Sequence, residues 1–466
     1  MREQAGAPRT VREVVSWLVS GIHEGVWPPE TRLPPERALA QQLGINRSTA
    51  AAAYLELQAR GLVDRRQGSG TYVHGDLWGI APDWARYLDR AAFRPMEPLV
   101  QRVWEARQRP EMVDFSQADI GRTLWPQDAL GELMAGIDLA GTLGYAHHLG
   151  LPALRQAVAD EVQRHAGIVA DPDSILITSG AQQALYLLAR GLLHPGDAIA
   201  IERPSFYYSQ ALFQSAGIRL LPIPMDDDGI LPDELEQLIA RDRPAMVWLN
   251  PTFHNPTTTT LSLERRLGVL KLCGAWNLPI VEDDAFGYLG VHGAQVPPPL
   301  RKLGPRQSVI YVGTLSKIVA PGLRIGWIIG PHPIIARLAD IRAQIDLGTP
   351  GPVQGLAAAF LASPAWPRHV DAVQRALRTR RDAFCEELRP LADIGASWAV
   401  PSGGLYVWVR FGDAGRDRTR LERAIAAGVV YGPGTMYGAG DGFARLNYAY
   451  LPQEQAARGI RRLAAI

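Results

Sequence analysis

Short, nearly continuous apolar runs alternate with helical segments from about residue 95 to the end of the chain. Strands of a parallel sheet show this pattern, because helices cover both faces of the sheet. The runs therefore predict a mostly parallel sheet between helix layers, an α/β fold. They lie at 175–179, 198–202, 219–223, 246–250, 279–283, 309–313 and 325–329. After residue 370, a helical segment and the stretches YVWVRF and FARLNYAY predict a smaller α+β subdomain.

Residues 1–75 show a different pattern and are expected to form a unit of their own. Apolar residues recur at helical spacing in three segments, 9–24, 34–44 and 46–61, and Asn46 is a candidate N-cap of the third. The last two helices, joined by a tight turn at Gly44, predict a helix-turn-helix. Two short β runs around residues 67–70 predict a hairpin wing.

A short linker separates the two regions. It begins at His74, and residues 83–94 then show helical spacing with Trp84, Tyr87 and Leu88 on one face. We expect these side chains to dock onto the second domain. The predicted boundaries are therefore 1–75 for the first domain, 76–94 for the linker and docking helix, and 95–466 for the second domain.

Composition narrows the class only a little. The 466 residues leave room for more than one domain, and a net charge of +1 indicates no partner. Cys273 and Cys385 lie far apart without metal-ligand spacing, which favours a reducing cytoplasm and predicts no metal site. The longest uncharged run, 347–367, is interrupted by prolines, and the N-terminus is polar. We therefore predict neither a membrane span nor a signal peptide.

Basic residues are placed where a helix-turn-helix meets DNA. Arg47, Ser48 and Thr49 open the third helix, the end that approaches base edges and phosphates, and Arg65 and Arg66 flank the wing. The net charge of residues 1–75 is only +2, from nine arginines and seven acidic residues. From these features alone, a small helical dimerisation module remains the alternative.

The segment from Leu33 to Val73 resembles the winged-helix domain of GntR-family regulators and covers that domain almost completely. This resemblance implies binding to a double-stranded DNA operator. Ala50 stands where a β-branched residue is common, and we expect the change to affect packing more than contact. The residues that the resemblance places on DNA are Arg37, Arg47, Ser48, Thr49, Gly68 and Gly70.

Lys317 is the most informative single residue of the second region. The chain has only three lysines, and a lysine amine can condense with an aldehyde, which a guanidinium cannot do. Lys271 and Lys302 lie in segments that predict solvent exposure. Lys317 instead follows the carboxyl end of a predicted strand, where α/β folds build their sites. A surface lysine in a loop is the alternative.

The stretch YVGTLSKIVAPGLRIGW, 311–327, resembles the Schiff-base segment of fold-type I enzymes that use pyridoxal 5'-phosphate (PLP), the aspartate aminotransferase superfamily. The resemblance implies that Thr314 and Arg324 bind the cofactor phosphate. Ser179, Gly180 and Ala181 open a helix directly after a strand, where free N–H groups can also hold a phosphate.

Asp283 ends a predicted buried strand, where a carboxylate is costly unless it is paired. A protonated pyridine nitrogen is a suitable partner, and an N-cap or a salt bridge is the alternative. By the same resemblance, Asn255 bonds the phenolic oxygen of the cofactor and Phe206 stacks on its ring. Arg445 grips a substrate carboxylate, and Tyr145 reaches the phosphate of a neighbouring subunit, which implies a homodimer.

Three positions depart from the pattern of these enzymes. Phe206 and Phe286 stand where tyrosine is frequent, and Thr258 replaces a usual glycine. The hydroxyl missing at Phe286 removes a donor to the phenolic oxygen, for which Tyr207 or Tyr288 could compensate. His147 and His148 are expected to be structural, and Cys273 to be a core residue.

A GntR-type winged helix followed by an aminotransferase-like domain resembles the MocR branch of transcriptional regulators over nearly the whole chain. The resemblance implies a PLP-dependent, DNA-binding regulator that senses a small amino compound, or PLP itself, through the bond to Lys317. A working PLP-dependent aminotransferase with an attached DNA-binding module is the main alternative. A binding module without PLP, in which Lys317 is idle, is a third.

Overall fold

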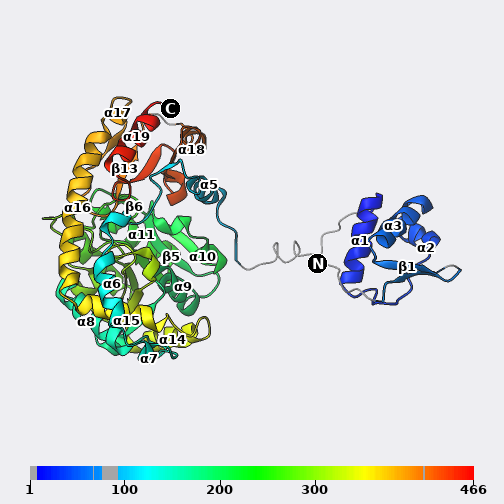
Figure 1. Cartoon of the computed structure of the whole chain (residues 1–466), viewed down its shortest axis with the longest axis horizontal. Helices are drawn as coiled ribbons and strands as arrows, with labels where there is room; N and C mark the ends of the chain where they lie inside the picture. Colours follow the sequence, from blue (N-terminus) through cyan, green and yellow to red (C-terminus); the bar gives the residue numbers. More distant parts are fainter. Residues whose placement is uncertain (1–7, 67, 76–92, 413–414) are drawn as a thin grey trace. The chain divides into compact units, whose positions relative to one another are not determined.

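The computed structural model describes residues 8–66, 68–75, 93–412 and 415–466. The chain divides into two compact units, Met1–Ala91 and Ala92–Ile466 (Figure 1). Most of the predicted linker and docking helix, including Trp84, Tyr87 and Leu88, lies outside the described residues. The predicted domain boundaries therefore stay predictions.

The N-terminal unit has the predicted winged helix-turn-helix. Its elements are α1 (Val11–His23), α2 (Glu36–Leu43), α3 (Arg47–Ala59), β1 (Val63–Arg66) and β2 (Gly70–Val73). Thr10 and Glu13 form a capping box at the start of α1. Gly44 ends α2 in the left-handed region at φ 67°, which glycine adopts without steric cost. Asn46 is the N-cap residue of α3, as predicted, but its side chain makes no capping hydrogen bond.

The core of this unit comes from the apolar faces of its three helices. Val14, Leu18, Leu39 and Leu57 are fully buried in it. The buried ring of Tyr54 on α3 adds a hydrogen bond, because its hydroxyl donates to the Pro34 carbonyl over 2.6 Å. This contact ties the recognition helix to the turn before α2.

An eight-stranded sheet forms the centre of the larger unit, with the order β4-β11-β10-β9-β8-β5-β6-β7. Its strands are β4 (Ile175–Thr178), β5 (Ala198–Arg203), β6 (Arg219–Asp226), β7 (Gly229–Ile230), β8 (Met246–Leu249), β9 (Ile280–Asp283), β10 (Val309–Thr314) and β11 (Gly326–Ile329). All seven predicted strands are present. The neighbours from β10 through β6 run parallel, whereas β11 is antiparallel to both β10 and β4.

Helices cover both faces of this sheet, as its near-continuous apolar strands require (Figure 1). Buried side chains such as Leu185 and Leu338 pack on one face, and Leu154 and Phe360 belong to a separate core cluster. The helices are α6 (Gln127–Ala135), α7 (Leu139–Thr142), α8 (Pro152–Ala166), α9 (Ala181–Leu192), α10 (Ala211–Ser215), α11 (Pro232–Asp242), α12 (Leu263–Ala275), α13 (Leu300–Leu303), α14 (His332–Ala343) and α15 (Gly351–Ala362).

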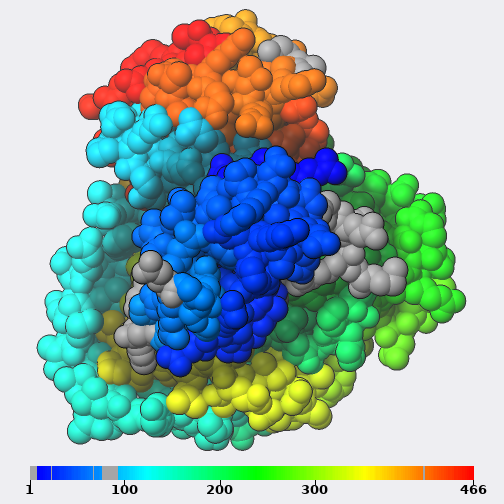
Figure 2. Space-filling view, turned by 90° about the vertical axis from the view of Figure 1, so that its right-hand side faces the viewer, coloured from blue at the N-terminus to red at the C-terminus, as the bar shows by residue number. Residues whose placement is uncertain are grey.

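The predicted smaller subdomain contains a four-stranded antiparallel sheet, β12-β13-β16-β15. Strand β3 pairs separately with β14. The segments coloured orange to red gather into one lobe together with α5 (Figure 2). The elements are α5 (Pro98–Arg107), β3 (Val113–Asp114), α16 (Ala365–Glu387), α17 (Arg389–Ala392), β12 (Ser397–Trp398), β13 (Tyr406–Arg410), α18 (Asp417–Ala426), β14 (Val429–Val430), β15 (Gly432–Pro433), β16 (Phe443–Asn447) and α19 (Gln453–Ala464).

The described residues offer neither a membrane span nor a metal-ligand cluster. Their helices include none with the length and apolar character needed to cross a bilayer. Their His, Cys, Asp and Glu side chains form no group of three or more that could hold a metal ion.

Candidate functional site

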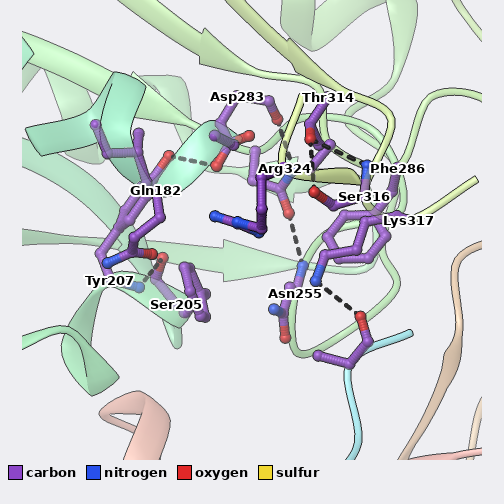
Figure 3. A pocket seen from close by; sticks show the side chains of 16 residues that line it. Gln182, Ser205, Tyr207, Asn255, Asp283, Phe286, Thr314, Ser316, Lys317 and Arg324 are labelled. Atoms are coloured by element: carbon purple, nitrogen blue, oxygen red, sulfur yellow. Dashed lines mark hydrogen bonds between the residues drawn. The ribbon is translucent and has the colours of Figure 1, made fainter. Parts of the chain in front are cut away.

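A cavity of about 190 Å³ lies at the carboxyl ends of strands β9 and β10 and at the start of α9 (Figure 3). Parallel strands deliver their following loops to one edge of the sheet, which brings distant residues together there. The predicted residues that line the cavity are Ala181, Phe206, Asn255, Asp283, Thr314, Lys317 and Arg324. The predicted site residues Ser179, Gly180, Arg445 and Tyr145 do not line it.

Lys317 points into this cavity and donates a hydrogen bond from Nζ to the Ala118 carbonyl over 2.8 Å (Figure 3). Burial lowers the pKa of its amine to about 8, although the carboxylate of Asp119 acts in the opposite direction. The other two lysines, Lys271 and Lys302, are exposed, as predicted. Lys317 is therefore the lysine whose amine is most readily deprotonated for attack on an aldehyde.

Asp283 ends β9 and is 6% exposed. Its Oδ2 accepts a long hydrogen bond, 3.4 Å, from the Tyr207 hydroxyl, and its Oδ1 is buried without a hydrogen-bond partner. Burial and the neighbouring Asp284 raise the pKa of Asp283 to about 7. Within residues 93–412 it forms no ion pair, so the salt-bridge alternative is not observed. A buried acceptor without a partner suits a cationic N–H donor from a ligand.

The predicted phosphate-binding groups gather where α9 begins. Arg324 donates from Nη2 to the Ser179 carbonyl over 2.7 Å. Gly180 has φ 81°, and a Cβ atom there would lie 2.8 Å from Nη2 of Arg324, so a side chain would displace the guanidinium. The N–H of Gly180 is not free, contrary to expectation, because it donates to the Thr178 carbonyl over 2.8 Å. Ala181 and the residue after it therefore carry the unpaired amides that open the helix.

Thr314, the other predicted phosphate ligand, is buried at the end of β10. Its hydroxyl donates to the Ile325 carbonyl over 2.8 Å and lies 3.0 Å from the Ser316 hydroxyl. Ser316 also lines the cavity and receives its orientation from Thr314. Sequence reasoning missed Ser316, although its position directly before Lys317 was a usable signal.

Asn255 links the cavity to Arg445. The Arg445 guanidinium donates to Oδ1 of Asn255 and to the Ser116 carbonyl, each over 2.8 Å, and it lies 4.1 Å from the centre of the Tyr406 ring. This leaves Nδ2 of Asn255 as a donor toward the cavity. Nε of Arg445 is buried without a partner. Arg445 is thus held beside the cavity rather than in its wall.

The three departures from the aminotransferase pattern have different consequences. Phe206 and Phe286 line the cavity, and so does Tyr207, but its hydroxyl donates to Oδ2 of Asp283 instead of replacing the missing donor. Tyr288 cannot replace that donor either, because its ring stacks on His165 at 4.1 Å, outside the cavity lining. Thr258 has φ 63°, a left-handed conformation that a glycine adopts without steric cost but a β-branched residue does not.

Tyr145 lies outside this constellation. It is 89% exposed, and the apolar side chain of Leu143 beside it is 73% exposed. His147 accepts a hydrogen bond at Nδ1 from the Leu149 N–H in the same turn, which fits its predicted structural role. Cys273 is buried in a core cluster, as predicted.

The N-terminal unit has a second cavity, a groove of about 680 Å³ between the recognition helix and the wing. Its lining includes Arg37, Arg47, Arg65, Arg66, Gly68 and Gly70, all predicted DNA contacts, and also Arg32 and Glu36. Ser48, although exposed, and Thr49 lie on α3 outside this lining. Sequence reasoning missed Arg32, whose guanidinium lies against Gly70, so that a Cβ there would be 2.8 Å from its Nε.

The guanidinium groups of the groove are held in two ways. Glu36 forms ion pairs with both Arg65 on the wing and Arg47 on the recognition helix, the latter at 3.5 Å. Arg66 instead lies 4.5 Å from the centre of the Tyr72 ring. Arg32 and Arg37 have no carboxylate partner among the described residues of this unit. The groove therefore keeps an excess of positive charge, as a surface that binds phosphates requires.

Comparisons with known proteins match both units. Residues 133–463 match the family of class I and II aminotransferases, and residues 10–73 match the bacterial regulatory proteins of the gntR family. The chain is 34% identical over 460 residues to the HTH-type transcriptional regulator YdfD of Bacillus subtilis, covering 97% of this chain and 95% of that protein. It is 28% identical over 440 residues to the regulator NorG of Staphylococcus aureus, covering 93% and 98%.

Solved structures resemble the larger unit. A multiple substrate aminotransferase from Thermococcus profundus is 29% identical with a TM-score of 0.77, covering 82% of this chain and 98% of that one. The kynurenine aminotransferase of Pyrococcus horikoshii, solved with PMP, is also 29% identical with a TM-score of 0.77, and the match covers 82% of this chain and 97% of that one.

A winged helix with a basic groove, followed by an aminotransferase fold with a buried lysine, defines a transcriptional regulator built on an aminotransferase-like domain. The chain belongs to the MocR-type regulators, the GntR-family proteins that carry an aminotransferase class I and II domain.

Proposed function

We propose that the chain is a DNA-binding transcriptional regulator that carries PLP on Lys317 and responds to a small amino compound, or to PLP itself. The supporting observation is a lysine of lowered pKa that lines the same cavity as Asp283, a carboxylate whose Oδ1 is buried without a hydrogen-bond partner. Of the three lysines in the chain, Lys317 is the one that lines this cavity and could bond the PLP aldehyde. The winged helix supplies the response, because the arginines that line its groove suit the phosphates of a DNA operator.

The residues of the cavity fit PLP group by group. The carboxylate of Asp283 would accept from the pyridine N–H, and Nδ2 of Asn255 would donate to the phenolic oxygen. The amide of Ala181 and the Arg324 guanidinium would hold the phosphate, and the Thr314 hydroxyl would join them by giving up its hydrogen bond to the Ile325 carbonyl. Phe206 would cover the ring. PLP supplies an aldehyde that condenses with primary amines.

Arg445 supports an effector that carries a carboxylate as well as an amine. Its buried Nε has no partner, and the rings of Tyr406 and Tyr437, whose centres lie 4.1 and 4.9 Å from its guanidinium, shield it from solvent. A carboxylate could take up the remaining donor capacity in a bidentate contact. Binding shifts a regulator only if the ligand favours one of its two states, and the bond to Lys317 gives such a difference.

We infer that the protein works as a homodimer. Leu139, Leu143 and Tyr145 are exposed on the same short stretch, which leaves an apolar surface that water solvates poorly. A second copy would cover this surface and bring Tyr145 toward the phosphate of its neighbour.

The test is a titration of the purified protein with a panel of amines and amino acids, followed by visible absorbance and by operator binding on the same samples. A responsive compound should change both signals, and Lys317→Ala should lose the lysine-bound absorbance and the response. An absorbance unchanged by Lys317→Ala would remove the cofactor assignment. A spectral change in the unaltered protein without any change in DNA binding would remove the sensor.

A working aminotransferase is the second candidate. It is favoured by 30% identity, over 393 residues, to the aromatic-amino-acid aminotransferase 1 of Thermococcus litoralis, and by the joint presence of Lys317, Asp283, Arg324 and Arg445. Turnover over many cycles with amino acids and 2-oxo acids would support it. Conversion of no more than one equivalent per chain would support the regulator.

A further inference from the structure

Glu202 is a buried acid that lies behind the cavity rather than in its lining. It stands near the end of β5, is 2% exposed and accepts a hydrogen bond at Oε1 from the Asn250 N–H over 2.6 Å. Its Oε2 is buried without a hydrogen-bond partner. The nearest basic group is Nε2 of His254, 4.0 Å away and also without a partner.

Asn250 connects Glu202 to two residues of the cavity lining. Its Nδ2 donates to the Asp283 carbonyl over 2.7 Å, and its Oδ1 accepts from the Asn255 N–H over 2.8 Å. The side chain of Asn255 in turn accepts a hydrogen bond from the guanidinium of Arg445. Glu202 therefore holds the backbone N–H of Asn250, and the side-chain amide of Asn250 contacts the backbone of both Asp283 and Asn255.

The surroundings of His254 determine where its proton lies. Its Nδ1 is 2.8 Å from the Thr257 hydroxyl, and that hydroxyl donates its own proton to the Thr259 hydroxyl over 3.0 Å. Thr257 must then accept from Nδ1–H, so Nε2 faces Glu202 as an acceptor. Only a protonated Glu202 can complement it.

The electrostatic surroundings of Glu202 also favour its protonated form. Glu202 and Asp283 are two buried carboxyl groups that disfavour each other's ionisation, and no arginine or lysine of the described chain pairs with Glu202. Burial raises the pKa of Glu202 to about 8 and lowers the pKa of His254 to about 3. At neutral pH Glu202 is therefore mainly protonated and His254 is neutral.

We propose that Glu202 is a positioning residue that acts as a neutral acid, with its proton toward His254, and thereby orders Asn250, Asp283 and Asn255 for the cofactor. This inference rests on the proposed binding of PLP for its functional consequence. The protonation state itself belongs to the chain alone and can be measured without a cofactor.

The decisive comparison is between Glu202→Gln and Glu202→Leu. A glutamine keeps the acceptor for Asn250 and offers an amide donor to His254, so PLP affinity and the pH titration of the lysine-bound absorbance should stay within about twofold of the unaltered protein. A leucine keeps the bulk but leaves the Asn250 N–H unpaired, and should weaken PLP binding about tenfold or more. Glu161→Gln is the matched control, because Glu161 is a buried glutamate paired with Arg164 on α8.

Loss of affinity in the glutamine variant would overturn the neutral acid, and full affinity in the leucine variant would overturn the positioning role. Infrared spectroscopy of the PLP-free protein gives a readout that does not need the leucine variant to fold. The carbonyl band of protonated carboxyl groups should lose intensity in Glu202→Gln and keep it in Glu161→Gln. If the unaltered protein binds no PLP, the proposed function fails, and the infrared band still decides the charge of Glu202.

Discussion

Lys317 shows how much a single position depends on its surroundings. Its sequence context marks it as the reactive lysine, but its lowered pKa comes from burial beside Ala118, a residue about two hundred positions away. A lysine amine attacks an aldehyde only when it is deprotonated. The depth of the cavity, which the sequence does not display, therefore decides the pH range in which the group works.

This property gives a prediction for cofactor loading. The free-amine fraction of Lys317 should rise with pH through about 8 instead of through the ordinary value of 10.5. The rate at which the PLP-free protein acquires lysine-bound absorbance should therefore rise from pH 7 and level off above about pH 9. Stopped-flow absorbance measures it, with Lys302→Ala as a control that should leave the profile unchanged. A rate still climbing steeply at pH 10 would contradict the burial of the amine.

The role of a residue could be predicted from the sequence where that residue belongs to a local motif. Thr314 and Arg324 keep fixed spacings from Lys317, and the structure brings both to the cavity. Arg445 is different, because its hydrogen bond to Asn255 joins positions 190 residues apart. Its partners could be found only once β16 lay beside the loop after β8. Contacts of this kind have no signal in one sequence.

At the scale of elements, the recognition helix and the wing are joined by Glu36. This carboxylate contacts Arg47 on α3 and Arg65 on β1, just before the turn of the wing, so both guanidinium groups have a partner that orients them before DNA binds. Order gained in advance lowers the entropy that binding must offset. The position of Glu36 in the basic groove was not predicted from the sequence. A count of charges registers this residue only as one unit less of net positive charge.

Arg47 is expected to contribute directly to DNA binding. Arg47→Ala should weaken operator binding by about 1–3 kcal/mol and flatten its salt dependence, because one phosphate or base contact is lost. Arg60→Ala is the matched control, since Arg60 lies just past the other end of α3 and pairs with Glu56. Gel shift or fluorescence anisotropy over a range of salt concentrations provides the measurement. Equal affinities of the two variants would remove Arg47 from the interface.

Strands were easier to foresee than their directions. Runs such as 309–313 and 325–329 are apolar on both faces, so burial identifies them without knowledge of their neighbours. The antiparallel direction of β11 depends on the short connection through Lys317 and Arg324, which turns the chain back along β10. That reversal places both residues at the same sheet edge, and thus builds the site.

At the scale of the whole molecule, the two units were separable in the sequence because their periodicities differ. Residues 1–75 repeat at helical spacing in short segments, whereas the strands beyond residue 95 are continuous apolar runs. Assembly is a separate question, and only Tyr145, through a resemblance, indicated it in advance. In the structure this residue and Leu143 are strongly exposed, which is unfavourable for a lone chain.

Dimerisation predicts an effect of charge on this surface. Leu143→Arg should raise the dissociation constant of the dimer about tenfold or more, because a guanidinium would be buried against apolar groups. Val400→Arg, at a position 62% exposed on the smaller subdomain, is the control and should leave the dimer intact. Analytical ultracentrifugation over a range of concentrations measures both. Identical association in the two variants would place the interface elsewhere.

The scarcity of lysine has a practical consequence for experiments on this protein. The winged-helix region contains no lysine, and Lys271 and Lys302 are exposed on the other unit. Reagents that couple to lysine side chains would therefore modify side chains of the aminotransferase-like unit and none of the winged-helix region. A fluorescent or immobilised form prepared in this way keeps every side chain of the winged-helix groove unmodified, so operator binding can be followed while the aminotransferase-like unit carries the label.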